Sequence, residues 1–140
     1  MSESAACIFC KIARGALPAT MVSQDEHTLT FMDIQPASPG HTLTIPKVHA
    51  PNVLDIAEAD LFAVTAAVQR VARAVQQALQ PDGMRVVQTN GAAAGQSVFH
   101  YHVHVIPMWE GQRLQLHGRT PANPEELTAL AAQIRAALAA

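Results

Sequence analysis

The stretch Phe99-His100-Tyr101-His102-Val103-His104-Val105-Ile106 decides most of what the sequence says about this chain. Histidines alternate with apolar residues, and in a β-strand the side chains at i, i+2 and i+4 point to one face. We therefore expect a strand over residues 98–107, with the three histidines on one face and the intervening residues on the other. The apolar flanks favour an interior strand over a solvated histidine face.

Three imidazoles on one face indicate metal binding or phosphoryl chemistry. One ion held by all three is awkward, because the outer Cα atoms lie ~13 Å apart at ~3.3 Å per residue, whereas Zn–N bonds measure ~2.0–2.1 Å. A neutral imidazole nucleophile, with neighbours that orient it and hold an anion, fits the spacing better. A zinc hydrolase that binds its catalytic ion on this face stays open as an alternative.

The remaining sequence predicts an α+β fold. Further strands are expected at residues 20–23, 28–33, 41–46 and 84–89, and a short apolar segment covers residues 7–13. Apolar residues with helical spacing between Leu61 and Leu79 predict a long helix, which Pro81-Asp82-Gly83 stops. Asn123 as N-cap and Pro124 after it begin a C-terminal helix. This order of elements favours a largely antiparallel sheet.

Composition narrows the class of protein. The 140 residues predict a single domain over 1–140, and 49% hydrophobic residues with a net charge of −2 exclude disorder. Lys and Arg form no cluster that would bind nucleic acid or an anionic membrane. The first residues lack the features of a signal peptide, and no apolar stretch is long enough to span a bilayer. We expect a cytoplasmic protein without nucleic-acid or membrane partners.

A glycine-containing loop precedes the histidines. Asn90-Gly91 and Gly95-Gln96-Ser97 place backbone N–H groups and a hydroxyl beside the histidine face. Turned backbone amides form concave anion sites. Such a loop alone is more often a simple turn, but its position beside three histidines favours anion binding.

Together these motifs resemble the histidine triad (HIT) family, in its nucleotide-hydrolase branch. The family pattern His-φ-His-φ-His-φ-φ, with φ apolar, fits residues 100–106, and the preceding residues 95–99, residues 31–34, residues 39–47 and Asn90-Gly91 also match. The resemblance covers about residues 7–108 and leaves 109–140 as a tail and C-terminal helix. It implies a HIT-like fold of about five antiparallel strands with one long helix, and a homodimer joined through the long helix and a sheet edge.

The resemblance also implies an activity, that of a nucleotide hydrolase or nucleoside phosphoramidase acting on an AMP or GMP derivative. His102 would attack the α-phosphorus, and water would release a nucleoside monophosphate from the nucleotidyl-histidine. His104 in the last triad position points to hydrolysis, because transferase relatives carry Gln there. His104 and His41 would position the rings around the phosphate, and Ser97 would contact the phosphate or the leaving group.

The implied nucleotide site draws on several segments. Asp33 would accept both ribose hydroxyls, which suits its paired oxygens, and Asn90 would order the site. The other nucleotide-binding residues are Gly95, Gln96 and Ser97 at the phosphate, and Phe9, Ile12, Leu17, Phe31 and Ile34 around the base. Viewed without the family, Asp33 reads as a turn residue, His41 as a strand start, and the apolar residues as core. A non-catalytic nucleotide-binding protein is therefore a third hypothesis.

One segment departs from the pattern. Bacterial relatives often continue Ile-Pro-Arg after the triad, whereas this chain has Ile106-Pro107-Met108-Trp109. A basic residue near the phosphates is missing, which argues against dinucleoside polyphosphate substrates.

Cys7-Ile8-Phe9-Cys10 provides half of a tetrahedral zinc site. A subset of HIT proteins binds zinc through this pair and two histidines, and the matching positions here are His49 and His100. A closed Cys2His2 site is structural, so catalysis would need no cofactor and would keep His102 and His104. Two buried thiols or a redox pair are the alternatives, although no βαβ unit follows the motif.

Overall fold

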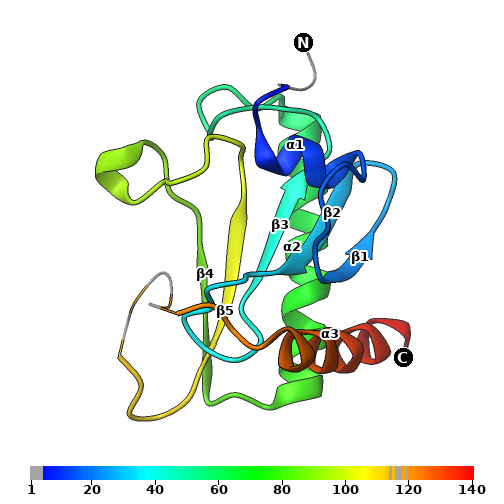
Figure 1. Cartoon of the computed structure of the whole chain (residues 1–140), viewed down its shortest axis with the longest axis vertical. Helices are drawn as coiled ribbons and strands as arrows, with labels where there is room; N and C mark the ends of the chain where they lie inside the picture. Colours follow the sequence, from blue (N-terminus) through cyan, green and yellow to red (C-terminus); the bar gives the residue numbers. More distant parts are fainter. Residues whose placement is uncertain (1–4, 114, 116–117, 119) are drawn as a thin grey trace.

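A computed structural model of the chain describes residues 5–113, 115, 118 and 120–140 (Figure 1). The elements follow in the order α1 (Ile8–Ala13), β1 (Met21–Gln24), β2 (Thr28–Met32), β3 (Thr42–Pro46), α2 (Glu58–Leu79), β4 (Gly83–Val87), the 3₁₀ turn η1 (Ala92–Ala94), β5 (Val103–Met108) and α3 (Pro124–Ala139). This is the α+β arrangement that the sequence predicts.

The five strands form one sheet in the order β1-β2-β3-β5-β4, and every neighbouring pair is antiparallel. The last strand, β5, therefore lies between β3 and β4, as its apolar flanks predict. This insertion places His104 opposite Leu43 of β3 and Val87 of β4. The histidine-bearing strand is held from both sides.

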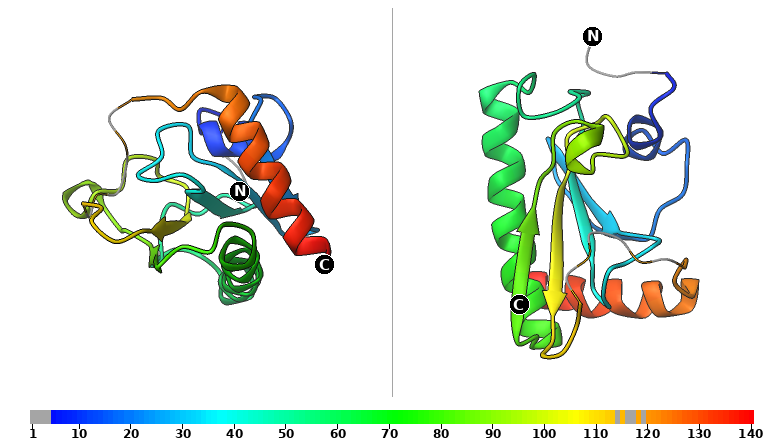
Figure 2. Two further views of the ribbon diagram at one scale, coloured as in Figure 1. Left: turned by 90° about the horizontal axis from the view of Figure 1, so that it is seen from below. Right: turned by 90° about the vertical axis from the view of Figure 1, so that its left-hand side faces the viewer.

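Helix α2 packs on one face of the sheet, and α1 lies on the other (Figure 2). Helix α3 crosses the lower end of the sheet in the right-hand view and packs against α2, β1 and β2. The first turn of α2 carries Glu58 and Asp60, which suit the positive end of the helix dipole. Its apolar residues Val64, Val68, Val71 and Val75 are buried against the sheet. Helix α3 begins as predicted, because the Asn123 side chain accepts a hydrogen bond from the Glu125 backbone N–H.

Two apolar clusters lie on opposite sides of the sheet. The larger one joins α2 and α3 to Met32, Tyr101, Val103 and Val105. The smaller one lies beneath α1 and consists of the buried residues Phe9, Leu29, Phe31, Leu43 and Ile45. The face that carries His102 and His104 is thus the α1 face, which the small cluster only partly fills.

The predicted strand over 98–107 is too long at its start, because β5 begins at Val103. The pairing of β5 with β3 stops at Thr44–Val103, although β3 continues to Pro46, and β4 ends at Val87 opposite His104. Instead the Tyr101 N–H donates to Ala50 O at 2.7 Å, outside the sheet. The other predicted strands agree with the observed bounds within two residues.

Helices that could cross a membrane are absent among the residues described above, since none combines sufficient length with sufficient apolarity.

Candidate active site and metal centre

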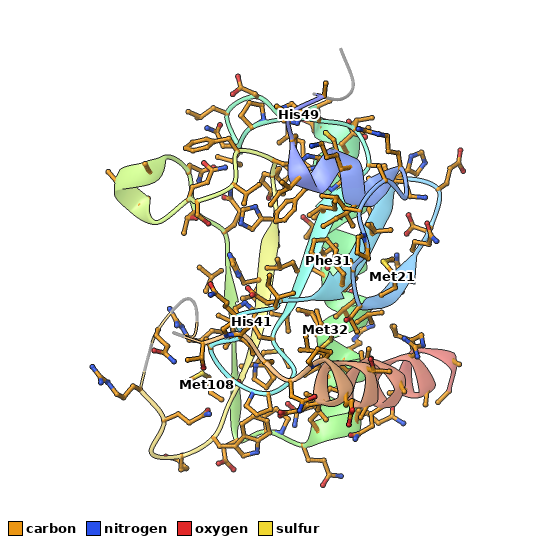
Figure 3. All side chains as sticks on the ribbon, in the orientation of Figure 1. Met21, Phe31, Met32, His41, His49 and Met108 are labelled. Carbon is orange, nitrogen blue, oxygen red and sulfur yellow. The ribbon has the colours of Figure 1, made fainter. Side chains whose placement is uncertain are left out.

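Three histidines meet on the α1 face: His104 lies in β5, and His102 and His41 immediately precede β5 and β3. The ring centroids of His102 and His104 are 5.0 Å apart, and those of His41 and His104 are 5.1 Å apart. Each of the three is at most 5% exposed. His41 immediately precedes β3, and its place in the fold is labelled in Figure 3. The expected grouping of His41, His102 and His104 is therefore present.

The His102 ring is oriented by the backbone carbonyl of His100. Its Nδ1 lies 2.7 Å from the carbonyl oxygen of His100. A carbonyl oxygen accepts only, so Nδ1 carries the hydrogen and the lone pair is on Nε2. This is the tautomer that a nucleophile needs.

A chain of hydrogen bonds orients His41 and His104 in the same way. The Ala37 backbone N–H donates to His41 Nδ1 at 2.9 Å, so His41 carries its hydrogen on Nε2. His41 Nε2 lies 2.9 Å from His104 Nδ1 and donates to it. Neutral His104 then carries its hydrogen on Nε2. The Ala37 N–H in the β2–β3 loop therefore determines which ring nitrogen of His41 and of His104 carries the hydrogen.

Asp33 lies at the same end of the sheet. Its carboxylate is buried; Oδ1 accepts from the Gln35 N–H at 2.8 Å, and Oδ2 is 3.4 Å from His41 Nε2. The carboxylate is thus oriented by its own loop. It is close enough to His41 to favour a hydrogen on His41 Nε2.

Phe9 of α1 forms an aromatic wall beside the histidines. Its ring contacts those of Phe31, His102 and His100 in edge-to-face geometry, with centroids 5.4, 5.2 and 5.9 Å away. The other apolar residues expected around the base differ in exposure, from half-buried Ile12 to exposed Leu17 and Ile34. Phe9, Phe31 and Ile12 share the cluster beneath α1.

The loop before the histidines is held by two amide side chains. Gln96 is buried: its Oε1 accepts from the Gly91 N–H at 2.7 Å, and its Nε2 donates to Pro51 O at 2.6 Å. Asn90 Oδ1 accepts from the Val53 N–H at 2.8 Å. Gln96 and Asn90 thus shape the loop, whereas Gly95 and Ser97 are exposed at its surface.

Cys7, Cys10, His49 and His100 come together around one point, and their donor atoms all lie within 4.8 Å of one another. Cys7 Sγ is 3.3 Å from His100 Nδ1, and Cys10 Sγ is 3.3 Å from His49 Nδ1 and 3.5 Å from His100 Nδ1. Zn–S bonds of ~2.3 Å and Zn–N bonds of ~2.0–2.1 Å in a tetrahedron put sulfur and nitrogen about 3.5 Å apart. The four residues therefore fit a zinc ion in both chemistry and spacing.

The His100 ring has the tautomer that metal binding requires. Its Nε2 lies 2.8 Å from Pro46 O and donates to it, so the lone pair on Nδ1 faces the sulfurs. Burial lowers the pKa of His100 to about 4 and keeps the ring neutral. The Nδ1 of His100 thus faces the sulfurs, and its ring contacts Phe9 of α1, which also contacts His102. The three histidines of the motif therefore lie on the α1 face of the sheet.

A second group of possible donors, Asp33, His41 and His104, fits zinc less well. Its two imidazole nitrogens are 2.9 Å apart and share a hydrogen, whereas two nitrogens on a tetrahedral zinc would be about 3.4 Å apart. The cysteine-containing group is therefore the better metal site.

Sequence reasoning missed the backbone groups that set the tautomers. The carbonyls of Pro46 and His100 and the N–H of Ala37 each fix one imidazole. Every residue has these groups, so only the path of the chain could reveal them.

Comparisons with known proteins agree with this geometry. The HIT domain model matches residues 14–111. "Protein hit" of Bacillus subtilis is 41% identical over 137 residues, which cover 95% of this chain and 94% of the relative. "Adenosine 5'-monophosphoramidase hnt1" of Schizosaccharomyces pombe is 35% identical over 130 residues, covering 91% and 95%. The crystal structure of a zinc-bound histidine triad family protein from Mycobacterium smegmatis has a TM-score of 0.85 at 37% identity, covering 96% of this chain and 94% of that one. With its fold, its buried histidines and these matches, the chain belongs to the HIT domain family.

Proposed function

We propose that this protein is a nucleoside phosphoramidase, a nucleotide hydrolase that cleaves the bond between the α-phosphorus of a purine nucleotide and its leaving group. The observation that carries the proposal is the 2.7 Å bond from His102 Nδ1 to the His100 carbonyl, which leaves the lone pair on Nε2. The name of the Schizosaccharomyces pombe relative, an adenosine 5'-monophosphoramidase, supports the same reaction.

In the first step His102 Nε2 attacks the α-phosphorus, a P–N bond to His102 forms, and the bond to the leaving nitrogen breaks. The leaving nitrogen takes up a proton from solvent water and departs as an amine. Neutral His104, whose Nδ1 accepts a hydrogen bond from His41, can donate its Nε2 hydrogen in a hydrogen bond to a phosphoryl oxygen. Water then attacks the nucleotidyl-histidine and gives its proton to the solvent, the P–N bond to His102 breaks, and the nucleoside monophosphate and the neutral His102 ring are released.

The nucleotide would lie on the α1 face. Asp33 would accept the ribose hydroxyls, and Phe9 and Phe31 with Ile12, Leu17 and Ile34 would border the base. Ser97 and the backbone of residues 95–97 would contact the phosphate and the leaving group from the exposed side of the loop. Asn90 and Gln96 would keep that loop in place through their amide hydrogen bonds.

A zinc ion held by Cys7, Cys10, His49 and His100 would have a structural role. Cys7 and Cys10 flank Phe9 on α1, and His100 directly precedes the catalytic segment. The ion would therefore fix the aromatic wall against His102, at the centroid distance of 5.2 Å. Bound zinc supplies folding energy at such a closed site, and the reaction itself is left to the histidines.

Hydrolysis of adenosine 5'-phosphoramidate, followed by AMP release, tests the proposal. We expect turnover by the wild-type protein and a loss of roughly 10³-fold or more in kcat for His102→Ala, because the covalent route disappears. His27→Ala is the matched control, since the His27 side chain is 61% exposed and remote from the strand face described above. Equal turnover in all three would show that His102 is not the nucleophile.

Two other outcomes identify the alternatives. AMP binding without turnover in the wild-type protein would indicate a nucleotide-binding protein. Loss of zinc together with activity in His102→Ala, with zinc retained in Cys7→Ser, would indicate a zinc hydrolase.

A further inference from the structure

The residues described after β5 include Gln115, Gly118 and Ala122, and these three lie on the loop that joins β2 to β3. Gly118 N–H donates to Gln35 O at 2.8 Å, and Ala122 N–H donates to Ile34 O at 2.9 Å. The Gln115 side chain adds a longer bond to Ala37 O at 3.4 Å. These three residues, called the tail below, therefore bond to the carbonyls of Ile34, Gln35 and Ala37 in the loop.

The opposite side of the tail and the middle of the loop have further hydrogen bonds. Arg85 of β4 donates to Gln115 O at 3.1 Å. The buried Ser38 hydroxyl donates to the carbonyl of Pro107 at the end of β5. The loop is thus held between the tail and β5, and the orange tail can be followed past the cyan loop in Figure 1.

This loop contains the donor that orients His41. The two ends of the loop are fixed to each other by the bond from Asp33 N–H to His41 O at 3.0 Å. Between them, the Ala37 N–H reaches His41 Nδ1 at 2.9 Å, and His41 passes its hydrogen toward His104. A shift of the middle of the loop would break the hydrogen bond from Ala37 N–H to His41 Nδ1 first, because the two ends of the loop are joined by the bond between Asp33 and His41.

Gly118 packs directly against the backbone of the loop. A Cβ added at Gly118 would lie 2.2 Å from Pro36 O and 3.1 Å from Pro36 C. Both atoms belong to the backbone next to Ala37, so they cannot rotate away as the end of a side chain would. A side chain at position 118 must displace the loop or the tail.

We propose that Gly118 is a positioning residue for the phosphoramidase reaction: its close contact with Pro36 lets the tail hold the β2–β3 loop where Ala37 fixes the proton arrangement of His41 and His104. The kinetic part of this inference rests on the proposed function. The structural part, that the tail sets the His41 tautomer, can be measured without any turnover.

The test compares the full-length zinc-loaded wild-type protein with Gly118→Ala. Gly83→Ala is the matched control, because a Cβ there meets nothing within 4 Å. Ala122→Pro is a second variant that removes the N–H donated to Ile34 O and leaves Gly118 unchanged. Each protein is assayed with adenosine 5'-phosphoramidate, and its histidine ring ¹⁵N signals are recorded near pH 8, where an imidazole of ordinary pKa ~6.5 is neutral.

We expect Gly118→Ala to lower kcat by about 10- to 100-fold, since small displacements of catalytic groups have effects of this size. The His41 signals should change from one tautomer, with hydrogen on Nε2, to a mixture of both. Ala122→Pro should change both readouts in the same direction, and Gly83→Ala neither. A loss of stability alone would lower the melting temperature without changing the tautomer of the folded fraction.

Wild-type kcat and wild-type His41 signals in a folded Gly118→Ala protein would overturn the proposal. If Gly118→Ala does not fold, the same result in Ala122→Pro would overturn it. If the wild-type protein has no phosphoramidase activity, the proposed function fails, and the ¹⁵N signals alone decide whether the tail positions His41.

Discussion

Replacing Cys7 by serine removes one of the four donors around the proposed zinc ion and little else. Cys7 is also the N-cap of α1, where its sulfur accepts a hydrogen bond from the Cys10 N–H at 3.3 Å. Serine is a favoured N-cap residue and its hydroxyl oxygen can accept the same bond. The helix start is therefore preserved, and the variant isolates the metal-binding role of the thiolate.

The size of the effect follows from linkage. A ligand at a thousandfold excess over its Kd stabilises the folded state by about 4.1 kcal/mol. For the 140 residues of this chain, an unfolding entropy of about 2.1 cal/mol/K per residue sums to about 0.3 kcal/mol/K. Zinc at that excess should therefore raise Tm by about 14 °C.

Calorimetric melting with and without a chelator, together with the zinc content per chain, measures this effect. We expect one zinc per wild-type chain and a Tm that falls by about 14 °C on chelation at that metal excess. Cys7→Ser should contain little zinc and melt at the temperature of the chelated wild-type protein, whether or not chelator is present. An equal chelator effect in both proteins would refute the assignment of Cys7 as a ligand.

Three further predictions follow from single features of the structure. With zinc chelated, the free energy of unfolding should fall by about 3 kcal/mol between pH 6.5 and pH 4. Burial lowers the pKa of His100 to about 4, so mainly the unfolded chain takes up the proton in that window. Denaturant melts of the wild type and His100→Gln would measure this fall, and identical pH slopes in the two proteins would contradict it. If Asp33 accepts both ribose hydroxyls, KM for a 2'-deoxy substrate should be about tenfold higher or more, since a hydrogen bond to a charged group contributes about 1.5–3 kcal/mol. Steady-state kinetics with adenosine 5'-phosphoramidate and its 2'-deoxy form would detect this, and an unchanged KM would place the ribose elsewhere. Val86 on the edge strand β4 and Phe62 on α2 are 56% and 62% exposed, so we expect β4 and α2 to form the dimer interface. Sedimentation should show a dimer for the wild type and a monomer for Phe62→Asp. A dimer in both proteins would mean that α2 is not part of the interface.

Much of the site was predictable because its residues carry their chemistry in the side chain. In any extended chain, Val103 points to the face opposite that of His102 and His104. The structure places Val103 in the apolar cluster with α2 and α3, and brings the rings of His102 and His104 together. The Cys7–Cys10 spacing on one helical turn likewise brings two sulfurs to one point. Both patterns are local, so no tertiary information was needed to read them.

The role of His100 was less accessible to local reasoning. Alternation alone groups it with His102 and His104, yet the pairing of β5 stops at Val103 with β3 and at His104 with β4, and the chain before Val103 leaves the ladder. Its ring is then fixed by the Pro46 carbonyl, and its Nδ1 faces the sulfurs. The resemblance to the family predicted this grouping of His100 with the cysteines.

The sequence by itself thus determined the antiparallel α+β fold, the nucleophile candidate and the metal donors, because periodicity and side-chain chemistry act over a few residues. The tertiary structure decided which nitrogen of each imidazole carries the hydrogen, since backbone groups of His100, Ala37 and Pro46 make that choice. It also decided that Gly118 lies against Pro36, a contact between segments more than eighty residues apart. Because almost every residue has the same backbone groups, their contacts depend on the path of the whole chain and cannot be predicted from the residue types alone.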